Sequence, residues 1–168
     1  MTARFRTSLP LMLCFWLALP FAVAGLDAQT APKKIDPCSL LTKAEIQEVL
    51  GKPVKDDKLN TKANPLVGQP CEYVVGDYGA FSILVKTTGP GETPDKVMAG
   101  LAKSGMKTAD APGIGDKSFF AFPGYGMLQL NTFKGTQYAI MTLLVPGLTE
   151  DAQKAPAEKL MKLILPKI

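Results

Sequence analysis

Three largely apolar segments joined by very short connections constrain the fold more than any other feature of this sequence. The segments are Lys117–Phe122, Met127–Phe133 and Thr136–Val145. They are rich in aromatic and branched residues, as β-strands are, and glycine-containing turns separate them. Because connections of four and two residues are too short for a crossover, neighbouring strands must be antiparallel. The last segment is apolar from Tyr138 onwards, which predicts a strand covered on both faces.

Two further strands and two helices are predicted upstream. Cys71–Val75 and Ala80–Thr87 alternate in polarity on either side of a glycine-bounded turn, as the strands of a hairpin do. A capping box at Thr42 begins a short helix, which ends at Gly51. A second helix is predicted over Pro94–Ser104, with its proline at the first helical position.

A third helix closes the chain. Thr149 is its expected cap and Pro166 ends it. Pro156 removes a backbone donor, so we expect a kink or a restart there. Its apolar face is formed by four residues: Leu160, Met161, Leu163 and Ile164.

The remaining segments are predicted to be loops. Residues 52–70 and 109–116 are rich in Gly, Pro, Asn and Asp, which favour turns, although the first has room for a short extended piece. The resulting order is α-β-β-α-β-β-β-α. It predicts an α+β fold with an antiparallel sheet of about five strands and flanking helices.

The N-terminus is typical of a secretory signal peptide over residues 1–24. Arg4 and Arg6 precede the uncharged apolar run Leu11–Leu19, and Ala22-Val23-Ala24 is a site that signal peptidase accepts. We therefore expect the protein to be periplasmic or secreted. An uncleaved anchor is the alternative, because the whole uncharged stretch is just long enough to span a bilayer.

Cleavage after Ala24 defines the expected organisation of the remaining chain. Residues 25–35 are small, polar and proline-containing, and are predicted to be a flexible leader. Residues 36–168 have a length that suits a single domain with its own core.

The charged residues restrict the possible partners. The sequence has no histidine, and both of its arginines lie within the expected signal peptide, which leaves 17 lysines and 15 acidic residues. Without histidine there is no Ser-His or Cys-His pair and no imidazole metal ligand. An arginine-free, nearly neutral chain without a basic amphipathic helix does not favour nucleic acid or membranes. We predict no nucleic-acid partner, no cofactor and no stable membrane insertion after signal cleavage.

Two cysteines remain after cleavage, Cys38 and Cys71. An even pair in an exported chain most simply forms a disulfide. A redox-active or metal-binding pair is the alternative, although the chain has no C-x-x-C spacing.

Three short motifs distributed along the chain carry a resemblance to a known family. They are Asp36-Pro37-Cys38-Ser39-Leu40-Leu41, Cys71-Glu72-Tyr73 and Gly113-Ile114-Gly115-Asp116. Together they resemble a family of secreted bacterial proteins, mostly actinobacterial lipoproteins, that is classed as a domain of unknown function. The resemblance implies an exported α+β domain with a Cys38–Cys71 bridge, and it implies no activity.

Two patterns that could bind phosphate or metal have simpler interpretations. Gly113-Ile114-Gly115 precedes a strand, whereas a dinucleotide-binding loop precedes a helix, so we interpret it as a turn. The loop acids have no spacing typical of a calcium loop, so no metal site is predicted. These acids are Asp56, Asp57, Glu72, Asp77 and Asp116.

An aromatic cluster provides the candidate binding surface, Phe120, Phe122 and Tyr125. Strand alternation places Phe119 on one face and Phe120 and Phe122 on the other, so one set belongs to the core. The other set, with Tyr125 in the following turn, is available to a partner. Coverage of both faces by helices and loops is the alternative.

These observations favour a non-catalytic exported domain that binds a small molecule or an envelope protein. The rival hypothesis is an envelope hydrolase that uses carboxylates or lysines, because such groups need not be adjacent in sequence. A structural envelope component is the third hypothesis.

Overall fold

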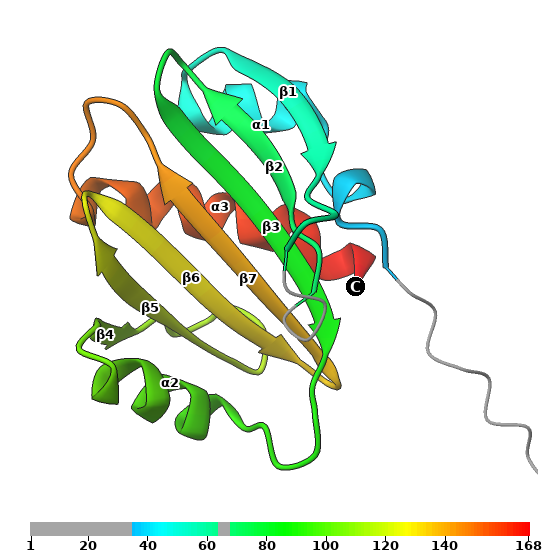
Figure 1. Cartoon of the computed structure of the whole chain (residues 1–168), viewed down its shortest axis with the longest axis vertical. Coiled ribbons are helices and arrows are strands. Elements are labelled where there is room, and N and C mark those ends of the chain that lie inside the picture. The colour runs from blue at the N-terminus through cyan, green and yellow to red at the C-terminus, as the bar shows by residue number, and fades with distance from the viewer. Residues whose placement is uncertain (1–34, 64–67) are drawn as a thin grey trace, which may run out of the picture. The chain divides into compact units, whose positions relative to one another are not determined.

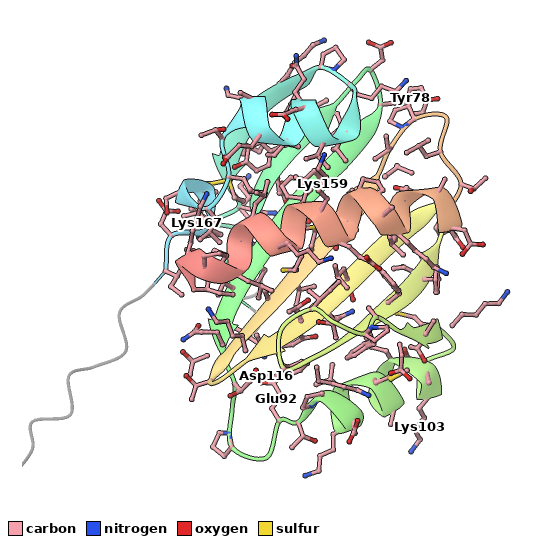
Figure 2. The ribbon with its side chains drawn as sticks, turned by 180° about the vertical axis from the view of Figure 1, so that it is seen from behind. Tyr78, Glu92, Lys103, Asp116, Lys159 and Lys167 are labelled. Atoms are coloured by element: carbon pink, nitrogen blue, oxygen red, sulfur yellow. A yellow bond between two sulfur atoms is a disulfide. The ribbon has the colours of Figure 1, made fainter. Side chains whose placement is uncertain are left out.

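The computed structural model describes residues 35–63 and 68–168. The predicted signal peptide and the leader up to residue 34 lie outside the described residues. In the described part, seven antiparallel strands form one sheet in the order β1-β2-β3-β7-β6-β5-β4. Figure 1 shows this sheet from one face with α3 behind it, and Figure 2 shows α1 and α3 in front of it from the opposite side.

The elements have the following bounds along the chain: η1 (Pro37–Ser39), α1 (Lys43–Leu50), β1 (Val54–Leu59), β2 (Cys71–Val75), β3 (Gly79–Thr87), α2 (Pro94–Lys103), β4 (Lys107–Asp110), β5 (Lys117–Gly124), β6 (Met127–Lys134), β7 (Gln137–Leu144), η2 (Asp151–Gln153), α3 (Lys154–Ile164) and η3 (Leu165–Lys167). The predicted α+β class and antiparallel pairing are confirmed.

The predicted strand number and element order are wrong, because two strands lie where loops were expected. β1 falls within residues 52–70, and β4 overlaps the start of residues 109–116. Both are edge strands, and each pairs with one neighbour only. Edge strands tolerate charged residues, which also protect them from pairing with other chains, so neither strand shows apolar alternation.

The sheet separates two hydrophobic clusters. The larger cluster lies between one face of the sheet and the helices α1 and α3. Ile46, Met141 and Leu160 are fully buried in it. The smaller one lies under α2, where Phe119 and Tyr138 pack against partly buried residues of that helix. β7 contributes to both clusters, so its first half is covered on both faces, as predicted.

The local signals at α1 are confirmed in detail. Thr42 Oγ1 accepts the Glu45 N–H at 3.2 Å, and a Glu45 carboxylate oxygen accepts the Thr42 N–H at 2.7 Å. Gly51 ends the helix in a left-handed conformation, with φ of 63°.

The last helix begins later than predicted. Thr149 Oγ1 accepts the Ala152 N–H at 3.2 Å and so caps the turn η2, while α3 begins at Lys154. Pro156 is thus in the first turn of α3, where its missing donor has no intrahelical partner to lose. Leu163 was expected in the apolar face but is 38% exposed.

Candidate functional site

A pocket of about 450 Å³ lies between η1 and the ends of β1 and β3. We call it the η1 pocket. The described residues that line it are Ile35, Asp36, Pro37, Leu59, Gly68, Gln69, Val85 and Lys86. Its walls are mainly apolar, and a volume of this size is typical of small-molecule sites.

The Ile35-Asp36-Pro37 segment forms one wall of the η1 pocket. Asp36 is extended, with φ of −82° and ψ of 111°, as the residue before a proline tends to be. Its carboxylate accepts the Cys38 N–H at 2.9 Å and so caps η1. The sequence motif therefore accounts for the start of the turn η1.

A disulfide holds this wall in place. Cys38 and Cys71 are joined by an S–S bond of 2.04 Å, which confirms the predicted bridge. Cys71 is fully buried and pairs with Leu59 of β1 and Ile83 of β3. The bridge therefore fixes η1 next to the strands that complete the pocket, and an oxidised pair offers no thiolate for a metal or for redox attack.

Two hydrogen bonds add to the disulfide. Lys167 Nζ donates to the Leu40 carbonyl at 2.6 Å, and the Tyr73 hydroxyl donates to the Leu41 carbonyl at 3.3 Å. Lys167 lies beside η1 in Figure 2, so the C-terminal turn reaches back to the start of the domain. The sequence contains no local signal for either contact, since the partners are far apart along the chain.

The charge of Lys86, one of the lining residues, is already compensated. Its Nζ is 2.6 Å from Glu92 Oε1, and the Gly89 N–H donates to Glu92 Oε2 at 2.9 Å. Burial raises the pKa of Glu92, but the hydrogen bonds from Lys86 and Gly89 outweigh burial and hold this pKa below its usual value. The ammonium also lies 5.4 Å from the centre of the Tyr138 ring, and burial together with the Glu92 charge raises the pKa of Tyr138.

The charge of Asp36, unlike that of Lys86, is not compensated by a described residue. Asp36 is exposed, and the described residues provide no ion pair for its carboxylate. The described lining of the η1 pocket therefore combines apolar residues with one uncompensated negative charge.

The predicted surface of Phe120, Phe122 and Tyr125 does not form one open face. Phe120 is 3% exposed within the larger core, and Phe122 is half-buried beside it. Lys154, at the start of α3, places its ammonium 5.7 and 5.3 Å from the two ring centres. Helix α3 thus packs against this face of β5, and Phe119 lies on the opposite face, as alternation predicts.

Tyr125 is the member of this set that remains accessible. It is 94% exposed and has a φ of 56°, a left-handed conformation that costs energy for a residue with a Cβ. Tyr78, 73% exposed, lies beside the loop that follows β7 (Figure 2).

The loop acids do not converge on a metal. No group of three or more potential ligands is found within residues 35–63 and 68–168. Glu72 accepts a hydrogen bond from Asn60 at 2.7 Å, and Asp116 accepts one from the Gly135 N–H. The side chains of Asp56 and Asp57 lie outside the described part of the structure.

No known protein family, curated protein or solved structure matches this chain. Among the helices that the structure describes, none has the length and apolar character needed to cross a bilayer. The η1 pocket is the candidate site, and the sequence does not reveal it because its described lining comes from four separate segments.

Proposed function

We propose that this protein is an exported, non-catalytic domain that binds a small, mainly apolar molecule in the η1 pocket. The observation that carries the proposal is the pocket itself, about 450 Å³ in volume and lined mainly by apolar residues. Sites of this kind combine an apolar lining with a few polar groups that orient the ligand. Asp36, Gln69 and Lys86 are the polar side chains among the described residues of the lining.

The attachments of η1 support the same proposal. The disulfide and the hydrogen bonds to Leu40 and Leu41 hold the wall before a ligand arrives. A preformed wall does not have to be ordered on binding, which favours affinity. The binding partner that fits this geometry is a small molecule.

The proposed export rests on two features. Residues 1–24 have the pattern of a signal peptide, and disulfides persist in the oxidising compartments that exported proteins reach. A periplasmic or secreted location, and membership of the secreted family that the motifs resemble, belong to this proposal.

The binding proposal is tested with a neutral hydrophobic fluorophore, N-phenyl-1-naphthylamine, added to the purified protein. Leu59 and Leu163 are each 38% exposed, but Leu59 alone lines the η1 pocket. We expect saturable fluorescence enhancement for the wild type and Leu163→Asp, and its loss in Leu59→Asp. Absence of saturable binding by the wild type, or equal binding by both variants, would overturn the proposal.

Docking to an envelope protein is a second candidate function, favoured by the exposed and strained Tyr125. A partner that copurifies with the wild type and with Leu59→Asp, but not with Tyr125→Ser, would favour it. Copurification that is unchanged in Tyr125→Ser would exclude this residue from the contact.

A further inference from the structure

We propose that the η1 pocket selects an apolar ligand that carries a cationic group, such as a primary alkylammonium, with Asp36 as the residue that recognises the charge. This inference rests on the proposed function and adds the charge of the ligand to it. It follows from three observations: the unused hydrogen-bonding capacity of the Asp36 carboxylate, the pairing of Lys86 with Glu92, and the apolar residues of the lining.

The Asp36 carboxylate has hydrogen-bonding capacity to spare. One oxygen accepts the Cys38 N–H at 2.9 Å, and the described residues give the carboxylate no other side-chain or backbone donor. An ionised carboxylate has about four acceptor positions, so an ammonium group can bind while the cap on η1 is retained. A charge-assisted hydrogen bond of this kind is stronger than one between neutral groups.

The opposite charge is not available for an anionic ligand. Among the described residues of the lining, Lys86 is the positively charged one, and its ammonium is already 2.6 Å from Glu92. A ligand carboxylate would have to compete with Glu92 and would also be repelled by Asp36. The part of the lining that the structure describes therefore favours a cation over an anion.

The apolar part of the ligand has its own place in the pocket. Four of the lining residues are apolar and larger than glycine: Ile35, Pro37, Leu59 and Val85. Burying one methylene group strengthens binding by about fourfold, as its transfer free energy implies. We expect affinity to rise with alkyl chain length until the pocket is full.

The test compares octylamine, 1-octanol and octanoate, which share one chain and differ in charge. Binding is measured at neutral pH for the wild type and for Asp36→Asn, since asparagine retains the oxygen that caps η1. We expect the wild type to bind octylamine about fivefold more tightly than 1-octanol, the range for a partly exposed ion pair, and octanoate most weakly. Asp36→Asn should bind octylamine and 1-octanol equally, because the charge that distinguishes the two ligands is gone.

A matched control and a second measurement keep the outcome clear. Asp95→Asn removes an exposed acid from α2, away from the pocket, and should behave as the wild type does. Added salt should weaken octylamine binding and leave 1-octanol binding unchanged, which tests the charge without any variant. Equal binding of octylamine and 1-octanol by the wild type would overturn the inference and leave the proposed function intact. If Leu59→Asp also left 1-octanol binding unchanged, the proposed function would fail as well.

Discussion

The Asp116 carboxylate accepts a 2.6 Å hydrogen bond from the backbone N–H of Gly135, in the turn between β6 and β7. The Asp116 N–H in turn donates to the Phe133 carbonyl at 2.8 Å. Together these bonds fasten the loop that precedes β5 to the β6–β7 hairpin. Glycine at position 115 allows this loop to lie close to the backbone of Phe133. Its φ is 59°, and a Cβ there would lie 2.5 Å from the Phe133 oxygen.

We predict that Gly115→Ala is much more damaging than Gly113→Ala. Both glycines have positive φ, but a Cβ at Gly113 would have no heavy atom within 4 Å. Gly113→Ala should therefore cost only the strain of its conformation, about 1 kcal/mol. Gly115→Ala adds a backbone clash, so we expect a loss of about 3 kcal/mol in urea unfolding. Equal losses would show that the close approach to Phe133 has no energetic role.

Gln153 should be one of the costliest polar side chains to replace. It is fully buried, its Oε1 accepts the Val145 N–H at 2.9 Å, and its Nε2 donates to the Gly126 carbonyl at 2.7 Å. Gln153→Leu leaves these backbone groups without their partner, and we expect a loss of about 2–4 kcal/mol in unfolding free energy. Gln47→Leu, on the exposed side of α1, is the control and should change stability by less than about 0.5 kcal/mol. A small loss in Gln153→Leu would contradict the role of Gln153 in joining the turn at Gly126 to Val145, the residue after β7.

Tyr125 should be replaceable with a gain in stability. Its φ of 56° suits asparagine and glycine better than tyrosine, and its ring is 94% exposed and buries little area. Tyr125→Asn is expected to raise the unfolding free energy by about 0.5–1 kcal/mol. Tyr78→Asn removes another exposed ring at a position without positive φ and should give no gain. A loss of stability in Tyr125→Asn would contradict the claim that the left-handed conformation of Tyr125 destabilises the protein.

The capping box of α1 predicts a pH dependence. Hydrogen bonds from the Thr42 backbone and hydroxyl hold the pKa of Glu45 below its usual value, and Lys167 adds to this effect. Between the folded and unfolded pKa values the unfolded chain binds more protons, so this stabilisation is present at neutral pH and is lost as the pH falls through the lowered pKa. Glu45→Gln should therefore be less stable than the wild type at neutral pH and equal to it in strong acid. Glu48→Gln, outside the capping box, controls for the loss of one charge, and a gap that persists in acid would contradict the prediction.

The sequence predicted the elements whose signals are local. The capping box at Thr42, the apolar alternation from Cys71 to Val75 and the short turns after β5 and β6 each depend on residues that are neighbours in sequence. The edge strands β1 and β4 were missed because a strand with a single neighbour does not need an apolar pattern.

The η1 pocket could not be predicted in the same way. Leu59 and Val85 come from different strands, and the third part of the lining, Ile35-Asp36-Pro37, is far from both in the sequence and is held near the sheet by the Cys38–Cys71 disulfide. The sequence favours an aromatic surface at Phe120 instead, because exposed and buried aromatic residues look alike in a sequence. In the structure Phe120 is buried, in the same core cluster as the apolar residues of α3.

Methyl NMR spectra recorded during titration with 1-octanol test the central claim, that the η1 pocket binds an apolar ligand, most directly. The predicted result is a set of saturable shifts at Ile35, Leu59 and Val85, with Leu148 and Leu163 unchanged, because these two are exposed but lie outside the pocket. Unchanged spectra, or shifts of equal size at Leu148 and Leu163, would contradict the claim.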